Sequence, residues 1–256
     1  MINRRRRRRM VSARHGGRPL VVATYNIHSC VGVDRRFDPD RVATVLRELE
    51  ADIIGLQEVG MRHRLAGGVE QHSYFAASTG LEAVASTLGR NYRGRFGNAL
   101  LTRFPVQSVR HIDLSVAGRE PRGAIDAELV VEGRRLRVVV THLGLRAAER
   151  RQQIQRLLLA LVAAPGGAEA TVVMGDLNEW RGRRGGIPAL DRRLGRAPAR
   201  RTFPSWLPVL SLDRIYVGGS ASIAALAVHR SALARLASDH LPLRAALDWS
   251  PPRPRS

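Results

Sequence analysis

The chain has 256 residues, 44% of them hydrophobic, which is enough for one large domain or two small ones. No apolar run reaches the roughly 18 residues that a membrane-spanning helix needs. The single cysteine, Cys30, excludes an intramolecular disulfide and points to a reducing compartment.

The formal net charge is +20, and all 42 basic residues are arginines. Lysine also binds phosphate well, so its absence is more typical of a GC-rich coding bias than of selection for phosphate binding. The first 19 residues hold eight arginines and the last seven hold two, which leaves +10 on the body. A basic body suits an anionic partner, such as nucleic acid, phospholipid or a phosphorylated metabolite.

The N-terminal run MINRRRRRRM is of low complexity, and it predicts a disordered, arginine-rich arm over residues 1–19. Either this arm binds anions, or Met10 is the true start and the run is an artefact of gene calling. No apolar region follows the run to complete a secretory or twin-arginine signal, so we expect a cytoplasmic protein. Residues 20–249 then form one domain, and residues 250–256 form a tail.

The first half of the body predicts strands and helices in mixed order. Leu20 to Ile27 is a buried strand, and Asp38-Pro39 caps a helix with one apolar face, formed by Val42, Val45, Leu46 and Leu49. Another buried strand spans 53–56, and a short helix lies near 71–78. Four strands separated by short turns follow, which implies antiparallel pairing, at 98–102, 106–114, 123–131 and 135–140.

The second half predicts a helix over 147–162 and a strand over 170–175, followed by an arginine- and glycine-rich loop over 181–205. Strands are expected near 212–217, 222–229 and 241–247. Many strands with few helices predict a single α+β domain, in which two packed sheets carry their helices outside.

Strongly polar residues stand where these apolar strands end. GDLNE, residues 175–179, places Asp176 and Asn178 directly after a buried strand. Gly, Asp and Asn form turns and cap helices, so one such site indicates a turn. The same pattern recurs along the chain, at Asn26, Glu58, His142, Asp213 and Asp239-His240. If these strands end along one edge of a sandwich, their side chains form a polar pocket on a rigid scaffold.

Together these residues form an ordered set of short motifs. They are Tyr25-Asn26-Ile27-His28, Leu56-Gln57-Glu58-Val59, Gly97-Asn98-Ala99-Leu100, Thr141-His142-Leu143, Gly175-Asp176-Leu177-Asn178, Leu212-Asp213-Arg214-Ile215 and Ser238-Asp239-His240. The set, which covers about residues 20–248, resembles the endonuclease/exonuclease/phosphatase superfamily, the deoxyribonuclease I-like group, and within it a small bacterial member. The resemblance implies an α+β fold, a four-layer αββα sandwich of two mainly antiparallel sheets with outer helices, and metal-dependent hydrolysis of phosphoesters.

The residue types suit that chemistry. A phosphodiester is anionic and repels a nucleophile until a divalent cation masks its charge. Magnesium prefers oxygen ligands, often one or two carboxylates with water and substrate, so Mg²⁺ is the expected cofactor, with Mn²⁺ as a substitute. Glu58 is the best candidate for a direct ligand. By resemblance, Asn26 and Asp239 complete or support the metal site.

Asp176 and Asn178 are two apart, so in an extended segment they point the same way. By resemblance, Asp176 orients or deprotonates the attacking water, and Asn178 holds that water or a phosphate oxygen. His240 would contact the phosphate, with Asp213 accepting its other ring proton and favouring the charged imidazolium. His142 would bind a phosphate oxygen or assist the leaving oxygen, and a buried core histidine is its alternative interpretation.

Arg122 and Asn98 are candidate substrate-binding residues, although a surface position suits Arg122 equally well. Of the remaining histidines, His28 is expected near the pocket, whereas His63, His72, His111 and His229 are expected at the surface. Trp180 and Trp206 flank the long loop, where they either wall the pocket or cap the core.

The motifs leave the substrate open. His142, the Gly97–Pro105 stretch and the short interval between Asn178 and Asp213 argue against a dedicated abasic-site endonuclease. We expect a phosphodiesterase that acts on a lipid head group or a small phosphorylated metabolite, with a non-specific DNA nuclease as the alternative. An inactive anion-binding protein is a third interpretation, which the intact motif positions argue against. The expected protein is a monomer whose partner is an anionic phosphoester substrate, with nucleic acid as a further partner and with a membrane surface reached through the substrate.

Overall fold

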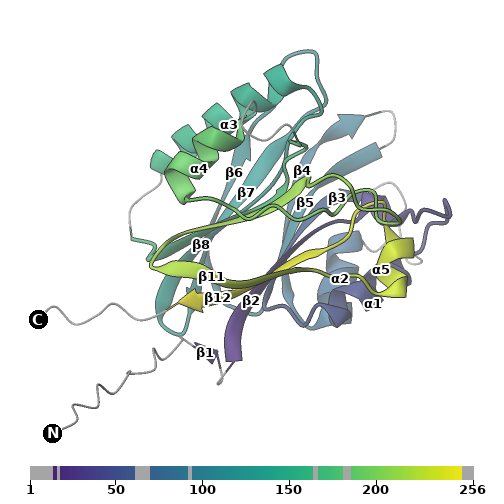
Figure 1. Ribbon diagram of the computed structural model, residues 1–256, viewed down its shortest axis with the longest axis horizontal. Helices are drawn as coiled ribbons and strands as arrows, with labels where there is room; N and C mark the ends of the chain where they lie inside the picture. The colour runs from purple at the N-terminus through teal and green to yellow at the C-terminus, as the bar shows by residue number, and fades with distance from the viewer. Residues whose placement is uncertain are drawn as a thin grey trace, which may run out of the picture.

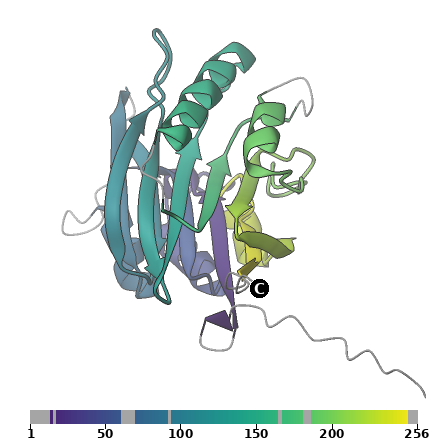
Figure 2. The same cartoon turned by 90° about the vertical axis from the view of Figure 1, so that its left-hand side faces the viewer.

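The computed structural model describes residues 14–15, 18–60, 70–91, 94–163, 167–180 and 186–249. In this part of the chain, two β-sheets pack face to face and helices cover both outer faces (Figure 1 and Figure 2). The predicted α+β sandwich of four layers is therefore confirmed. None of the described helices is both long and apolar enough to cross a membrane.

The two sheets are mainly antiparallel, as predicted. In the first sheet the strand order is β11 (Ala221–Val228), β12 (Leu243–Trp249), β2 (Arg18–Asn26), β3 (Ile53–Gly60), β5 (Gly94–Thr102) and β4 (Glu82–Asn91), with β1 (Arg14–His15) paired to β2. In the second the order is β10 (Asp213–Gly219), β9 (Ala170–Asp176), β8 (Arg134–His142), β7 (Gly123–Val131) and β6 (Val106–Asp113). The parallel pairs are β2 with β3 and β8 with β9.

Three apolar clusters bind the layers together. The first lies between the two sheets and includes Val22, Ile53, Val140 and Met174. The second packs the first sheet against α1 (Pro39–Glu48), α2 (Gln71–Thr79) and α5 (Ala232–Ala237). The third packs the second sheet against α3 (Ala147–Val162) and α4 (Ile187–Leu194). One short 3₁₀ turn, η1 (His28–Cys30), follows β2.

Helix α1 illustrates how the sequence produces these layers. The Asp38 side chain accepts a hydrogen bond from the Arg41 backbone N–H at 2.9 Å, which caps the helix, and Pro39 fills its first turn. The predicted apolar face is buried, at Val42, Val45, Leu46 and Leu49. Each of these side chains contributes roughly 1.5–3 kcal/mol through its burial.

Three details of the sequence-based expectations are wrong. Residues 187–194 form helix α4 rather than loop, because Ile187, Leu190 and Leu194 present an apolar face to the third cluster. Residues 232–237 form α5, which was not expected. Strand pairing begins inside the expected arm, since β1 pairs with the start of β2. Residues 1–13 and the tail 250–256 lie outside the described residues.

The topology brings the polar strand ends to one edge. The parallel strands β2 and β3 end on the same side, as do β8 and β9, whereas the antiparallel β10 and β12 begin there. In the ladders, Asp176 pairs with both His142 and Asp213, and Asn26 pairs with Gln57. The predicted convergence of these strand ends at one edge is therefore confirmed.

Candidate active site

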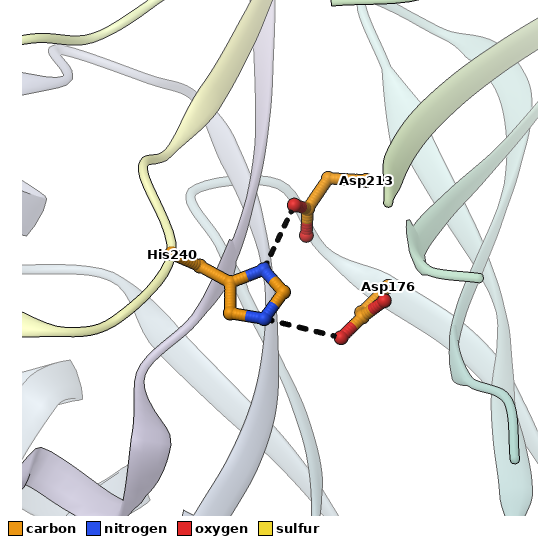
Figure 3. A group of neighbouring side chains, drawn as sticks. All are labelled: Asp176, Asp213 and His240. Atoms are coloured by element: carbon orange, nitrogen blue, oxygen red, sulfur yellow. Dashed lines mark hydrogen bonds and ion pairs between the residues drawn. The ribbon is translucent and has the colours of Figure 1, made fainter. Parts of the chain in front are cut away.

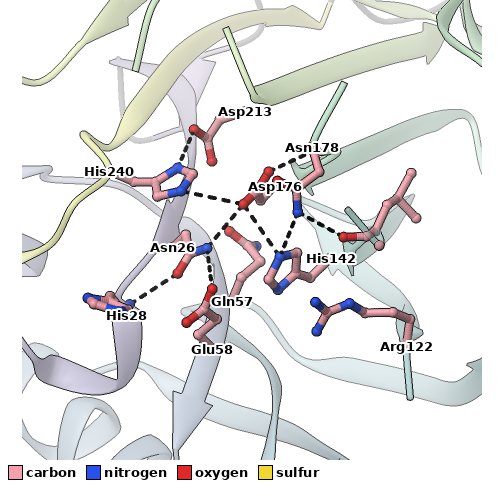
Figure 4. Close-up of polar contacts among 12 residues, drawn as sticks. Asn26, His28, Gln57, Glu58, Arg122, His142, Asp176, Asn178, Asp213 and His240 are labelled. Carbon is pink, nitrogen blue, oxygen red and sulfur yellow. Dashed lines mark hydrogen bonds and ion pairs between the residues drawn. The ribbon is translucent and has the colours of Figure 1, made fainter. Parts of the chain in front are cut away.

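The residues predicted from the strand ends form one connected group of polar contacts (Figure 4). Its members are Asn26, Glu58, His142, Asp176, Asn178, Asp213 and His240. Asp176 lies at the centre, with His240 and Asp213 on one side and His142 and Asn178 on the other. Two sheets and six strand ends thus supply a single site.

The GDLN turn positions Asp176. Gly175 has φ 149°, and a Cβ atom there would lie 1.8 Å from the Thr141 carbonyl oxygen, so glycine allows β8 and β9 to meet at this point. Asp176 accepts hydrogen bonds from the Asn178 backbone N–H at 2.9 Å and from Asn26 Nδ2 at 3.1 Å. The stretch is therefore both a turn and part of the site.

Burial raises the pKa of Asp176 to about 6. His240 opposes this shift, and the nearby Asp213 carboxylate adds to it. Hydrogen bonds from Asn178 and Asn26 favour the ionised form but do not offset the burial. Asp176 is thus more basic than an ordinary aspartate.

His240 lies between two carboxylates (Figure 3). Its Nδ1 atom is 3.0 Å from Asp213 Oδ2, and its Nε2 atom is 3.6 Å from Asp176 Oδ2. Burial alone would lower the pKa of His240, but Asp213 and Asp176 together raise it to about 10. His240 is therefore an imidazolium at neutral pH, as predicted from its Asp213 partner.

This pair is held in place by Thr202 and Phe203, which the sequence did not single out, and by Ser238, which was quoted only as part of a motif. Thr202 donates its hydroxyl to Asp213 Oδ2 at 2.5 Å, and the Phe203 ring centroid lies 4.9 Å from that of His240. Ser238 Oγ accepts the His240 backbone N–H at 3.2 Å. Thr202 reaches the site because Leu241 N donates to its carbonyl at 2.8 Å, a long-range contact without a local sequence signal.

His142 is neutral. Asn178 Nδ2 donates to the Leu143 carbonyl at 2.9 Å and faces His142 Nε2 at 3.1 Å, so this ring nitrogen is an acceptor. Burial lowers the pKa of His142 well below its ordinary value, and the positive charges of Arg122 and His240 lower it further. The 3.5 Å approach of Nε2 to Asp176 Oδ2 is therefore not an ion pair.

Glu58 is displayed by an irregularity in the ladder. The register between β3 and β5 shifts between Leu56 and Val59, and Glu58 has a positive φ of 55°. A bulge of this kind re-aims a side chain. Asn26 Nδ2 donates to Glu58 Oε1 at 3.0 Å, and Asn26 Oδ1 accepts the His28 backbone N–H at 3.0 Å, which fixes the orientation of the amide.

Two groups of donor atoms suit a cation. Glu58 and Asp239 offer carboxylate oxygens, and Asn26 Oδ1 keeps a second lone pair, a set of the kind that Mg²⁺ prefers. Asp239 is linked to this group through His28, whose Nδ1 lies 3.9 Å from Asp239 Oδ1 and whose backbone N–H donates to Asn26 Oδ1. Asp176, Asp213 and His240 offer three donors within 4.8 Å of one another. In that second group most donors already bond each other, although Asp213 Oδ1 has no hydrogen-bond partner among the described residues.

Arg122 and Asn98 lie beside the His142 side of the pocket. Arg122 is only 5% exposed, so a surface position is wrong for it. Its guanidinium is 2.8 Å from Glu120 Oε2, and its Nε atom has no hydrogen-bond partner in the described part of the chain. Asn98 is buried and donates to the Gly123 carbonyl at 3.0 Å, next to Arg122. Asn98 therefore positions the backbone that carries Arg122.

The remaining candidates divide between the pocket and the surface. His28 lies near the pocket, as expected, whereas His72 and His229 pair with surface glutamates and His63 lies outside the described residues. Trp180 and Trp206 are largely exposed, so neither caps the core. Gln57 was quoted only as part of a motif, but it is fully buried at the site, and its Nε2 has no partner among the described residues.

The chain is similar in sequence to known proteins. Residues 23–240 match the model of the endonuclease/exonuclease/phosphatase family. The chain is 36% identical over 245 residues to YbhP, an uncharacterised protein of Escherichia coli K12, which covers 88% of this chain and 95% of YbhP.

Solved structures share the fold at low sequence identity. The human nocturnin catalytic domain aligns with a TM-score of 0.72 and 20% identity over 95% of this chain and 97% of its own. A mannosyl-6-phosphatase of Bacteroides thetaiotaomicron aligns with a TM-score of 0.70 and 16% identity over 89% of this chain and 99% of its own. The chain therefore belongs to the endonuclease/exonuclease/phosphatase family, whose members are phosphoester hydrolases.

Proposed function

We propose that this protein is a Mg²⁺-dependent phosphodiesterase that acts on a lipid head group or a small phosphorylated metabolite. The observation that carries the proposal is the convergence of one basic carboxylate, one imidazolium and a group of oxygen donors at a single, largely buried site. These groups stand on the ends of packed strands, a rigid support of the kind that catalysis requires.

Glu58 would hold the metal, with Asn26 and Asp239 completing or supporting the site. When bound, a divalent cation offsets the negative charge of the phosphate and stabilises the charge that develops during hydrolysis. The bulge at Glu58 and the fixed amide of Asn26 hold this carboxylate at the edge of the pocket before any ligand arrives.

Asp176 would accept the proton of the attacking water as the water oxygen forms its bond to phosphorus and the ester P–O bond breaks, and the leaving alkoxide would take a proton from solvent. The Asn26 amide and the Asn178 backbone N–H orient the carboxylate for this step. His240 would donate its Nε2 proton in a hydrogen bond to a phosphoryl oxygen, while Asp213 holds the ring and its charge.

The other residues would orient the substrate and the water. His142 accepts from Asn178, so we assign it the positioning of that amide rather than donation from Nε2 to the phosphate. Asn178, thus fixed, would hold the attacking water or a phosphate oxygen. Arg122 would attract the anionic substrate, since its guanidinium faces the pocket beside His142 (Figure 4).

Hydrolysis of bis-p-nitrophenyl phosphate tests the proposal. We expect turnover with Mg²⁺ or Mn²⁺, its loss in EDTA, and a reduction of about 100-fold or more in Glu58→Gln. Glu82→Gln is the matched control, because Glu82 is exposed at the opposite end of the same sheet, where β3 begins. Full turnover in EDTA, or an unimpaired Glu58→Gln variant, would contradict the metal-dependent assignment.

DNA is the second candidate substrate, favoured by the excess of 42 arginines over 22 acidic residues. A panel at equal enzyme and magnesium concentrations separates the classes. It contains abasic-site duplex, plasmid, single-stranded DNA, sphingomyelin, phosphatidylglycerol and inositol phosphates. Incision at abasic sites hundreds of times faster than any other turnover would overturn the substrate assignment and leave the hydrolase assignment standing.

A further inference from the structure

A hairpin beside the pocket exposes its apolar side chains. Residues 203–210 are closed by backbone hydrogen bonds between Phe203 and Leu210, at 3.1 and 2.8 Å. At its tip Trp206, Leu207 and Val209 are 65%, 55% and 53% exposed. These three side chains contribute little to the core, and an exposed apolar group of this kind marks an interaction site.

The hairpin is fixed to the active site. Its first residue, Phe203, packs against the His240 ring, and the Ser205 backbone N–H donates to the Asp239 carbonyl at 2.7 Å. Ser205 Oγ also donates to the Arg235 carbonyl of α5 at 2.9 Å. Whatever holds the tip therefore also fixes its distance from the pocket.

The chain before the hairpin is strongly basic. Between Asp191 and Asp213 there are five arginines and no acidic residue, and all five arginines are exposed: Arg192, Arg193, Arg196, Arg200 and Arg201. In Figure 1 this green segment leads from α4 toward α5. Guanidinium groups bind phosphate oxygens in a bidentate manner, so the segment complements a dense array of phosphates.

A second exposed apolar pair, Leu145 and Trp180, lies close in sequence to His142 and Asn178, which stand on the far side of Asp176 from His240. Leu145 follows His142 by three residues, and Trp180 follows Asn178 by two. Arg150 connects them, since it donates to the Leu145 carbonyl at 2.6 Å and lies 5.4 Å from the Trp180 ring. Apolar side chains thus stand on both sides of the polar pocket.

We propose that the 203–210 hairpin docks the protein on an anionic phospholipid bilayer, with Trp206 and Leu207 in the interfacial region and the arginines at the phosphates. Tryptophan favours this interfacial depth, and apolar tips flanked by basic residues bind anionic membranes. A tip of three side chains is small for a stable protein interface, which buries about 800 Å² per partner. The inference rests on the proposed function for its substrate class, a phosphoester in a phospholipid head group.

The test compares two double variants of the full chain. Trp206→Gln with Leu207→Gln changes the hairpin, and Leu159→Gln with Val162→Gln removes equally exposed apolar side chains from α3, where they are 64% and 67% exposed. Partition into sedimented vesicles is measured with phosphatidylglycerol and phosphatidylcholine in equal parts. About 0.5 M salt screens binding that is due to charge alone, including binding by the N-terminal arginines.

We expect the hairpin variant to bind these vesicles at least tenfold more weakly than the wild type, and the α3 variant to bind within twofold of it. In the wild type, Trp206 fluorescence should shift to the blue and be quenched by brominated lipid, whereas buried Trp249 should not respond. Equal binding by both variants, or no wild-type binding, would overturn the proposal. Loss of single-stranded DNA binding in the hairpin variant without any vesicle binding would also overturn it, in favour of a nucleic-acid surface.

Turnover of bis-p-nitrophenyl phosphate separates this inference from the proposed function. Both variants should keep wild-type turnover on this soluble ester, because neither changes a group that contacts the pocket. Vesicle binding without turnover of any phosphoester would refute the hydrolase assignment and leave the docking surface standing. Turnover without hairpin-dependent vesicle binding would refute the docking surface and leave the hydrolase assignment standing.

Discussion

Two histidines approach the same oxygen of Asp176, yet they carry different charges. His240 and His142 are both buried, and their Nε2 atoms lie 3.6 and 3.5 Å from Asp176 Oδ2. Burial lowers the pKa of both, so it cannot explain the difference. His240 has a second carboxylate, Asp213, on its other nitrogen, whereas His142 accepts from Asn178 and lies near Arg122.

The comparison shows that the partner on each ring decides its role. A charged histidine can donate a proton to an anionic oxygen, and a neutral one that accepts from an amide can fix that amide in place. The pocket therefore has one side that stabilises negative charge and one side that positions a polar group. Each of the following predictions changes one partner and asks whether the two sides remain different.

The largest effect is expected when the shared carboxylate is removed. Asp176→Asn should lower turnover at least about 100-fold, because it removes the proposed proton acceptor. It should also lower the pKa of His240, since Asp176 helps to raise it. Steady-state kinetics measure the first effect, and NMR titration of the ring protons measures the second. A folded variant with near wild-type turnover would refute the role of Asp176.

The two histidines themselves should differ in importance. His240→Gln should reduce turnover about 100-fold, because the imidazolium is lost from the phosphate side. His142→Gln should reduce it only about tenfold, since glutamine can still accept from Asn178. The two variants serve as controls for each other, measured at one magnesium concentration and checked by thermal unfolding. Equal losses would mean that the charge difference has no catalytic consequence.

The charge on His240 also predicts a pH dependence of stability in metal-free protein. Its folded pKa is raised from the ordinary 6.5 to about 10, so the ion pair stabilises fully below pH 6.5 and this contribution is lost as pH rises through 10. Asp213→Asn should lower the folded pKa of His240, so the loss of stability with rising pH should be complete at a lower pH. Each pKa unit removed corresponds to roughly 1.4 kcal/mol.

Urea unfolding in EDTA between pH 6 and 10.5 measures this effect. The wild-type free energy of unfolding should fall across that range more steeply than that of Asp213→Asn. Parallel curves would show that Asp213 does not hold the charge of His240. Because Asp213 also accepts from Thr202, a Thr202→Val variant separates the loss of that hydrogen bond from the loss of the carboxylate.

Much of this arrangement could be predicted from the sequence where the signal is local. The Asp38 cap gave the correct start of α1 and the apolar stripe gave its buried face, because capping and helix periodicity depend on neighbouring residues. The polar ends of the strands predicted one pocket, since the ends of paired strands must share an edge. The contact between His240 and Asp213 was implied by the family resemblance, and it is present at 3.0 Å.

Other features depend on contacts between distant residues. The α4 stripe is short and stands among arginines and glycines, so composition concealed it. The acceptor role of His142 Nε2 follows from the Leu143 carbonyl, which takes one Asn178 proton and leaves the other for the ring. No local pattern encodes that choice, and the sequence alone therefore left His142 with two interpretations.

The smallest effect concerns Arg122, which helps to keep His142 neutral. In Arg122→Met the pKa of His142 should rise, because a nearby positive charge is lost. It should stay below the ordinary value, since burial is the larger cause and is unchanged. The KM for an anionic ester should rise about tenfold, or ~1.4 kcal/mol, for one lost charge near the substrate.

Glu120→Gln provides the matched control, because it removes the acid that pairs with Arg122 at 2.8 Å and leaves the guanidinium in place. That variant should leave the pKa of His142 low and the KM nearly unchanged. Titration of the His142 ring protons by NMR and KM measured at low ionic strength give two independent readouts. If Arg122→Met and Glu120→Gln give the same pKa of His142 and the same KM, the charge of Arg122 affects neither His142 nor the substrate and serves only its pair with Glu120. The neutrality of His142 would then depend on burial and on His240, and the two sides of the pocket would differ without help from Arg122.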